Sequence, residues 1–133
     1  LVVKKTDRLY PRAVSGIRVG QKCGRLHFLN STGWSVPDGT VIGQYVLRYA
    51  DGQQSEVPIV YGENTRDWFV SSDGSAKLNG ARVAWSGLTG YGAPIRLFLF
   101  TLENPRPDVV VRSLDFRSAM TPCQPFLIAI TVE

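Results

Sequence analysis

The sequence predicts an all-β fold, an antiparallel β-sandwich or jelly roll built from about eight short strands. Several runs alternate apolar and polar residues with the period of two that is typical of strands with one buried face. No segment keeps a helical period, and 13 glycines and 8 prolines are spread along the chain as turn residues would be. With 133 residues, of which 44% are hydrophobic, the chain is long enough for one domain with its own core.

The clearest element is a β-hairpin. Residues 45–50 (YVLRYA) alternate, with two tyrosines and a leucine on one side of the expected strand. Asp51 and Gly52 follow, and glycine accepts the positive φ that a tight turn requires. The returning run at 56–61 contains Pro58, which has no N–H to donate, so we expect this strand at a sheet edge or beside a bulge.

The other predicted strands are short apolar runs bounded by turn residues. The run 95–102 (IRLFLFTL) is the most hydrophobic and predicts a central strand; we expect it to form most of the core together with 109–116 and 126–132. A stiff corner at 103–108 separates the first two of these runs, because each of its two prolines fixes φ. The remaining predicted strands are 16–20, 25–30 and 81–85, with a short apolar run at 68–70 and a glycine-rich loop at 86–92.

The net charge of +4 is not concentrated in one part of the sequence. Eleven of the 15 basic residues are arginines that stand singly, and only Lys4 and Lys5 are adjacent. A nucleic-acid-binding protein usually gathers its basic residues on one face, so we expect no nucleic-acid partner. No apolar run approaches the length of a membrane span, so we expect no membrane partner. The first residues, LVVKKTDRLYP, lack a signal-peptide pattern, so an exported protein would have lost its signal or carried it on a longer parent chain.

Two cysteines, Cys23 and Cys123, lie far apart in the sequence. No Cys-x-x-Cys pair or Cys/His cluster is present, so the sequence predicts no zinc site. No metal-ligating residue or cofactor is predicted, and a structural calcium stays open. Two readings of the cysteines stay open. They form a single disulfide that ties the beginning of the domain to its end, or they are two buried thiols.

Catalysis is not expected from these residues. His27 is the only histidine, and it lies inside a predicted strand without an acidic neighbour, which favours a packed or hydrogen-bonded core imidazole over a catalytic one. Glycoside hydrolysis needs two carboxylates across a cleft, and Glu56, Glu63, Glu103 and Asp67 are each typical of a solvated or turn residue. The sequence therefore predicts a protein that is not an enzyme.

Binding is better supported, because the loop after the hairpin combines an aromatic residue with polar groups. A sugar presents flat C–H faces surrounded by hydroxyls, and its complement is an aromatic ring flanked by amide, carboxylate and guanidinium groups. Trp34 and Tyr91, in glycine-rich loops, are expected to be exposed and to add a second platform, whereas Trp85 is expected in the core. For Trp68, an exposed and a buried position both stay open. The predicted carbohydrate-binding residues are Trp34, Asn64, Arg66, Asp67, Trp68 and Tyr91.

Four stretches carry a resemblance to a known kind of domain: YVLRYADGQQSEVPIVYGENTRDWF, ARVAW, ENPRPDVVVRSLDFRSA and PFLIAITVE. They resemble the β-sandwich modules of large secreted bacterial polysaccharide-degrading proteins, over about residues 15–133. The resemblance implies that residues 1–133 are a single jelly-roll module, similar to galactose-binding-like domains and excised from a larger multi-domain protein. It also implies a non-catalytic carbohydrate-binding role, an extracellular location (secreted or at the cell surface), and catalytic domains of the same parent chain as partners. Neither the glycan nor any ligand-contacting residue carries over from the resemblance.

Two other functions stay open at this point. The first is a structural spacer or protein-docking β-sandwich that has no glycan ligand and keeps its tryptophans in the core. The second is a small hydrolase. The primary expectation is a module that binds polysaccharide or oligosaccharide, with the modest affinity of a shallow site, a Kd of roughly 10 µM to 1 mM.

Overall fold

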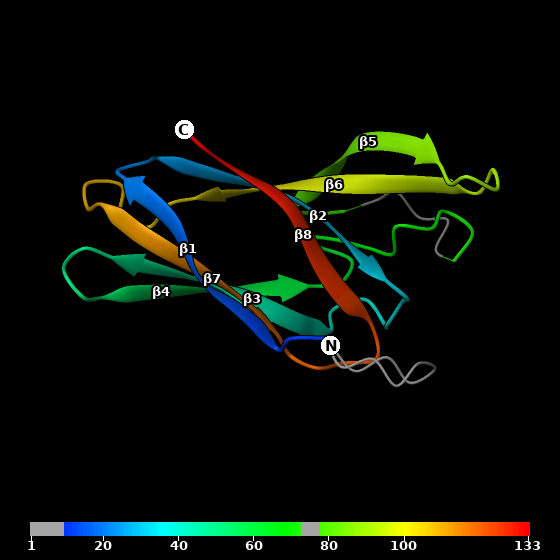
Figure 1. The fold of residues 1–133 in the computed structure, drawn as a ribbon, viewed down its shortest axis with the longest axis horizontal. Helices are drawn as coiled ribbons and strands as arrows, with labels where there is room; N and C mark the ends of the chain where they lie inside the picture. The colour runs from blue at the N-terminus through cyan, green and yellow to red at the C-terminus, as the bar shows by residue number, and fades with distance from the viewer. Residues whose placement is uncertain (1–9, 73–77) are drawn as a thin grey trace.

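The computed structural model describes residues 10–72 and 78–133, and within them the strands pair into two antiparallel sheets packed face to face (Figure 1). One sheet has the order β1-β7-β3-β4 and the other the order β5-β6-β2-β8. The predicted β-sandwich is thus confirmed. Across the same residues, no helix is long and apolar enough to cross a membrane. The strands are β1 (Ala13–Gln21), β2 (Arg25–Gly33), β3 (Val41–Tyr49), β4 (Gln54–Val60), β5 (Ala81–Leu88), β6 (Pro94–Glu103), β7 (Val111–Ser118) and β8 (Gln124–Val132).

The core lies between the sheets and is centred on β2 and β3. Tyr45 of β3 stacks on Phe28 of β2 with ring centroids 4.0 Å apart, and both side chains are fully buried. Burying an aliphatic or aromatic side chain of this size stabilises a fold by about 1.5–3 kcal/mol. The tyrosine hydroxyl accepts a hydrogen bond of 3.1 Å from Asn30, so the core contains no unpaired phenol at this position.

The prediction that 126–132 is a major part of the core is wrong. No side chain of this run is fully buried, and Ile128 is 58% exposed. The reason is topological, because β8 is an edge strand beside β2, and only Leu127, Ile130 and Val132 of this run pack, partly buried, against the core. A register shift between Leu127 and Ala129 interrupts the alternation of β8. The other two predicted core runs, β6 and β7, are internal strands and do contribute fully buried side chains. The three runs do not form most of the core, however, because most of the buried cluster comes from β2, β3, Ile59 and Tyr61.

The predicted hairpin is β3 and β4. Residues 50–52 form a three-residue loop in which Tyr49 N–H donates to the carbonyl of Gln53 at 2.9 Å. Gly52 has a φ of 85°, the left-handed conformation for which glycine is needed, and its N–H donates to the Tyr49 carbonyl at 3.1 Å. The turn at Asp51 and Gly52 is confirmed, and so is the edge position of the Pro58 strand, because β4 ends its sheet.

Two elements differ in extent or kind from the sequence-based expectation. The strand predicted at 81–85 continues to Leu88, so the glycine-rich loop shortens to a turn at 89–92. The apolar run 68–70 forms only an isolated bridge, between Phe69 and Ile95. It is too short for a strand of its own and lies against the end of β6.

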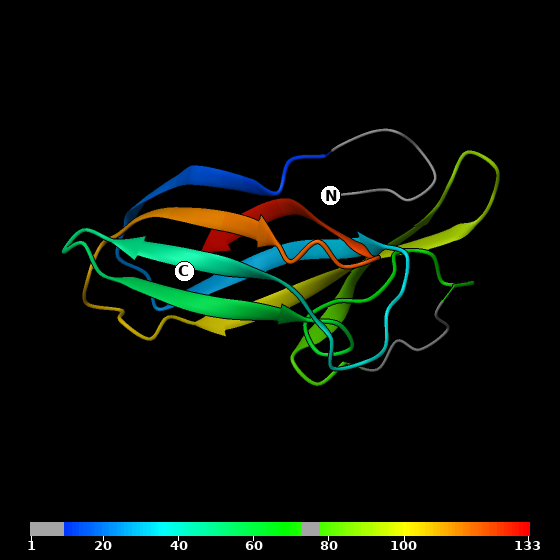
Figure 2. The same cartoon turned by 90° about the horizontal axis from the view of Figure 1, so that it is seen from below.

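The two sheets do not end at the same level. Figures 1 and 2 show the β5–β6 hairpin reaching well beyond the neighbouring end of the sheet that contains β3 and β4. Edge strands β1 and β8, which belong to different sheets, lie along the same side of the sandwich, and residues of both line one shallow groove. The overhanging end of the β5-β6-β2-β8 sheet is where the candidate site is found.

A disulfide between Cys23 and Cys123 is ruled out by their positions, and both are free, buried thiols. Cys23 precedes the first residue of β2, whereas Cys123 precedes Gln124, the partner of the last residue of β2. The length of β2 separates them, about 26 Å for eight residue steps. Disulfides need Cα atoms about 4.4–6.8 Å apart, so the second reading of the cysteines, two buried thiols, is the one observed.

Candidate functional site

A short segment, residues 66–68, is built into the overhanging sheet between β2 and β6. The pairing of these two strands ends at Asn30 and Phe98, and the strands then separate. Thr32 donates its N–H to the Arg66 carbonyl at 3.1 Å and accepts from the Trp68 N–H at 2.9 Å, while Arg96 N–H donates to the Trp68 carbonyl at 2.9 Å. Backbone hydrogen bonds on both sides therefore fix the position of Trp68 within the sheet.

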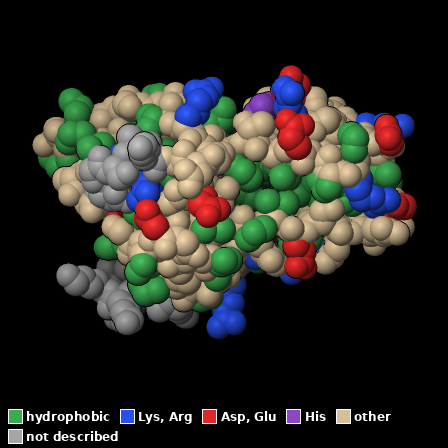
Figure 3. All heavy atoms as spheres, turned by 180° about the vertical axis from the view of Figure 1, so that it is seen from behind, with side chains coloured by type: hydrophobic (Ala, Val, Ile, Leu, Met, Phe, Trp, Pro, Cys, Tyr) green, Lys and Arg blue, Asp and Glu red, His purple; other side chains and the backbone are tan. Residues whose placement is uncertain are grey.

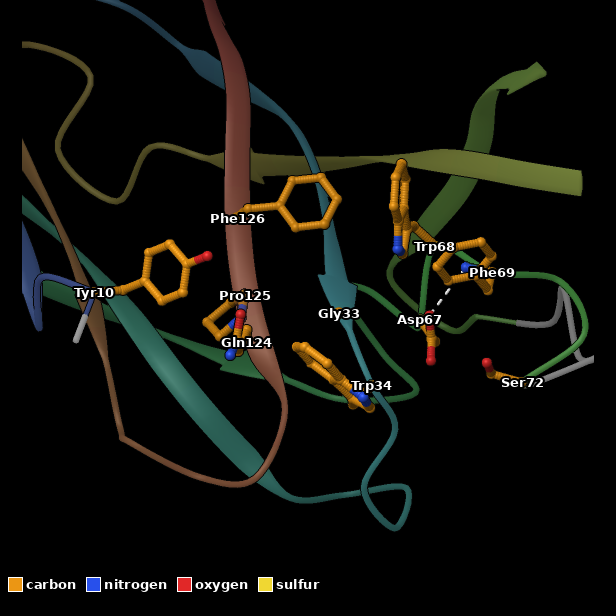
Figure 4. A pocket seen from close by; sticks show the side chains of 10 residues that line it. All are labelled: Tyr10, Gly33, Trp34, Asp67, Trp68, Phe69, Ser72, Gln124, Pro125 and Phe126. Atoms are coloured by element: carbon orange, nitrogen blue, oxygen red, sulfur yellow. Dashed lines mark hydrogen bonds between the residues drawn. The ribbon is translucent and has the colours of Figure 1, made fainter. Parts of the chain in front are cut away.

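Next to this segment lies a cleft of about 440 Å³, which we call the aromatic cleft. Figure 4 shows the rings of Trp34, Trp68 and Phe126 around one central space. The Trp68 ring lies edge-on to the rings of Phe69 and Phe126, with centroid separations of 4.9 and 5.8 Å. The residues that line the cleft are Tyr10, Gly33, Trp34, Asp67, Trp68, Phe69, Ser72, Gln124, Pro125 and Phe126.

Trp34 occupies a conformation that is costly for a large side chain. Its φ is 62°, in the left-handed region, although it is not glycine. A bulky residue held there costs on the order of 1–3 kcal/mol and persists only where its surroundings impose it. Thr32 helps to do so, since its hydroxyl donates a hydrogen bond of 2.9 Å to the Trp34 carbonyl. The outcome is a tryptophan that is 52% exposed on the wall of the cleft.

Asp67 supplies a carboxylate at the cleft, and its position is fixed by local hydrogen bonds. One carboxylate oxygen accepts from the backbone N–H of Phe69 at 2.9 Å, and the other lies 3.5 Å from the Ser35 hydroxyl (Figure 4 shows the first bond). The backbone N–H of Asp67 donates to the Tyr61 hydroxyl at 3.2 Å. Asp67 is almost fully buried, so its carboxylate shapes the floor more than the rim.

Gln124 adds a polar group of a different kind. Its side-chain amide nitrogen is buried and has no hydrogen-bond partner within 10–72 and 78–133. Leaving a buried donor unsatisfied costs about 1–3 kcal/mol, so such groups are rare in folded proteins. In a cleft, a donor of this kind is one that a hydroxyl-bearing ligand or a water molecule would satisfy.

Of the six residues predicted to bind carbohydrate, three meet in the aromatic cleft: Trp34, Asp67 and Trp68. Asn64 and Arg66 are buried and do not line it. The side-chain oxygen of Asn64 accepts from the Val60 N–H at 2.7 Å, and Arg66 pairs with Asp38. Both side chains hold the loop that carries Trp68 in place.

Tyr91, the sixth predicted residue, lies in the turn between β5 and β6 and does not line the cleft. It is 79% exposed, as expected for its loop, and Trp34 is exposed as expected too. The expectation that Trp85 lies in the core is wrong, because it is 48% exposed. Trp85 is on edge strand β5, paired with Leu97, and its ring faces away from the core.

Sequence reasoning missed Phe126, Gln124 and Phe69 as cleft residues. Phe126 and Gln124 belong to β8 and are about 90 residues from Trp34 in the chain, so no local pattern links them. The alternation within β8 does predict that Phe126 faces away from Leu127, which packs against the core. An outward phenylalanine beside a turn was the one available signal.

His27 is hydrogen-bonded on the outer side of its sheet. Its Nδ1 lies 2.8 Å from the Thr101 hydroxyl and its Nε2 2.9 Å from a carboxylate oxygen of Glu133. The imidazole is hydrogen-bonded as predicted, but it does not lie in the core, and it has an acidic neighbour, Glu133, that is distant in the sequence. In the described part of the chain, no group of three or more His, Cys, Asp or Glu side chains is arranged to hold a metal ion.

Comparison with known proteins adds no relative. No protein-family model, no curated protein and no solved structure matches this chain.

Proposed function

We propose that this domain binds polysaccharide without cleaving it and that the aromatic cleft is its binding site. The observation that carries the proposal is Trp34, a large aromatic side chain held half-exposed in a strained left-handed backbone beside Trp68 and Phe126. Strain of this kind clusters at binding and catalytic sites, because a residue selected only for stability would be replaced by glycine or asparagine there.

The chemistry of the cleft fits a sugar ring. Aromatic rings offer flat apolar faces to the C–H groups of a pyranose, and the cleft has five rings from four separate segments of the chain. Polar side chains are few among the lining residues: the buried carboxylate of Asp67, the Ser72 hydroxyl, and the Gln124 amide, whose nitrogen has no hydrogen-bond partner among the described residues. This composition favours a ligand that is apolar on its faces and rich in hydroxyls at its periphery.

Charge supports a neutral ligand. Figure 3 shows the face opposite to that of Figure 1, and basic and acidic side chains are interspersed on it. Within the aromatic cleft, Asp67 is the charged side chain among the lining residues. We therefore expect a Kd of roughly 10 µM to 1 mM that changes little with salt, since a neutral sugar releases no counterions.

We also propose where the domain acts and to what kind of parent protein it belongs. A module with this affinity becomes useful when a parent chain carries several copies or a catalytic domain, because linkage raises the effective concentration at a polymeric substrate. We propose that it acts outside the cell, attached to a polysaccharide-degrading parent protein.

Affinity electrophoresis against a set of neutral plant polysaccharides tests the proposal, followed by calorimetry with fragments of those that retard the protein. We expect at least one polysaccharide to retard the wild-type protein, the Trp34→Gly variant to fold and migrate freely, and the Tyr91→Ala variant to behave as the wild type. Tyr91 is the matched control, because it is more exposed than Trp34 and lies outside the cleft. If no polysaccharide retards the wild type, a spacer or protein-docking role replaces this one. If Trp34→Gly and Trp68→Leu both bind as the wild type does, the binding site lies outside the aromatic cleft.

A further inference from the structure

The outer face of the β5-β6-β2-β8 sheet carries apolar side chains in a row that starts at the aromatic cleft. Phe126 of β8 pairs with Ser31 and faces outward, opposite to Leu127. Trp68 contacts Phe126 and lies between β2 and β6. Leu97 of β6 follows, and it pairs with Trp85 of β5. None of these four side chains packs against the core cluster between the sheets.

Trp85 has a defined position at the far end of this row. A Cβ atom at Gly87 would lie 2.3 Å from Cη2 and 2.6 Å from Cζ2 of the Trp85 ring, so the ring lies over the backbone of Gly87. Only glycine leaves room for it there. The ring is thus placed along its own strand, and it remains 48% exposed.

The spacing between the two tryptophans follows from the sheet. Trp68 is hydrogen-bonded between β2 and β6, where it occupies the position of an additional strand. Trp85 is on β5, the next strand beyond β6. Two strand spacings separate their backbones, roughly 10 Å. That distance exceeds one sugar ring and corresponds to a short stretch of an extended chain that crosses the strands.

We infer that Trp85 is a second aromatic platform, and that the ligand is an extended, linear stretch of polysaccharide lying across the outer face of this sheet from the cleft to β5. The inference rests on the proposed function and narrows its ligand class. A chain end or a single sugar would use the aromatic cleft alone, whereas an internal stretch reaches both tryptophans and passes over Leu97. β5 is the edge strand of its sheet, so the row ends at that edge and a longer polymer would extend beyond it.

Calorimetry with a length series tests the inference. The probes are β-1,4-linked gluco-, xylo- and manno-oligosaccharides, each as the disaccharide, tetrasaccharide and hexasaccharide. For the series that binds, we expect the wild-type affinity to rise from disaccharide to hexasaccharide, and Trp85→Ala to lose roughly two- to tenfold in affinity for the hexasaccharide only. Tyr91→Ala, on the same hairpin but outside the row, should match the wild type, and Trp85→Tyr should keep most of the hexasaccharide affinity.

A measurement on the wild-type protein tests the inference even if the variants misfold. The indole N–H signal of Trp85 in an NMR spectrum should shift with the hexasaccharide and stay in place with the disaccharide. Equal affinity for all lengths, or a hexasaccharide that leaves the Trp85 signal unmoved, overturns the inference while the cleft remains a sugar site. If no oligosaccharide or polysaccharide binds the wild type, the proposed function fails and the inference with it.

Discussion

The guanidinium of Arg66 donates two hydrogen bonds to the carboxylate of Asp38, from Nη1 to Oδ1 at 2.9 Å and from Nη2 to Oδ2 at 2.8 Å. This fork joins the loop after β4 to the loop between β2 and β3. The Arg66 side chain is 7% exposed and also lies over the Tyr61 ring, whereas Asp38 is 63% exposed. Arg66 is therefore a structural residue that holds the segment bearing Trp68, although the sequence suggested that it binds ligand.

Replacing Arg66 separates these two roles. Arg66→Gln should lower the free energy of unfolding by roughly 1–3 kcal/mol, because it removes two charge-assisted hydrogen bonds and a packed stem. Well below its melting temperature the variant should keep the wild-type Kd for a bound polysaccharide. Urea unfolding and affinity electrophoresis give the two readouts, with Asp38→Asn as the matched change at the exposed partner. Unchanged stability with lost binding would show instead that Arg66 contacts the ligand.

Relieving the backbone strain at Trp34 should stabilise the fold. Glycine adopts the observed φ of 62° without a steric cost, so Trp34→Gly should unfold at the same or a higher urea concentration than the wild type, despite the loss of a large side chain. Trp34→Ala keeps the strain and should be the less stable of the two variants. A Trp34→Gly protein that is clearly destabilised would mean that the ring contributes to packing and that its backbone is not under strain.

Asp115 makes the stability depend on acidity. Its carboxylate is almost fully buried and accepts from Arg48 at 2.8 and 3.0 Å, from Arg117 at 3.1 Å and from the Gly16 N–H at 3.0 Å, so it connects β1, β3 and β7. The hydrogen bonds from Arg48, from the Gly16 backbone and from Arg117 hold the pKa of Asp115 below its usual value. A lowered folded pKa gives stability that is complete above the unfolded pKa, about 3.9, and is lost as the pH falls through the folded value.

The Asp115→Asn variant tests that sign. At neutral pH it should be less stable than the wild type, by about 1–3 kcal/mol, because charge-assisted bonds become neutral ones. As the pH falls below about 4, Asp115 is protonated first in the unfolded wild type and, at lower pH, in the folded protein, so the difference in stability should shrink. Urea titrations at several pH values measure it, with Arg117→Gln, which removes one donor, expected to give a smaller effect. A difference that grows in acid would contradict the assignment.

The two cysteines should behave as thiols even in protein purified without reductant. Burial raises the pKa of both Cys23 and Cys123 and keeps them from reagents, so they should react slowly in the native protein. Denatured protein should titrate two thiols, each single Cys→Ala variant should titrate one, and reductant should leave the melting temperature unchanged. Denatured protein without reactive thiols would show that the chain does form a disulfide.

Local sequence determined the strands and the turn at Asp51 and Gly52. Period-two alternation and the positive φ of glycine depend only on residues close in the sequence, so they can be recognised before the partner strand is known. The edge position of β4 was predicted for the same reason, because Pro58 has no N–H wherever its strand lies. Exposure of Trp34 was also predicted from its glycine-rich loop.

Strand order decided what the sequence alone left open or suggested wrongly. Trp85 is exposed and 126–132 is only partly buried because β5 and β8 are edge strands, which no local pattern reveals. The cysteines lie at opposite ends of β2, because Cys23 precedes its first residue and Gln124, next to Cys123, pairs with its last residue, Gly33. Two predicted binding residues, Asn64 and Arg66, hold a loop in place and do not line the cleft. Phe126 and Gln124, which were not predicted, line the cleft together with Trp34. Residue types near one another in sequence establish which chemistry is present, but a binding site depends on long-range pairing that brings distant segments together.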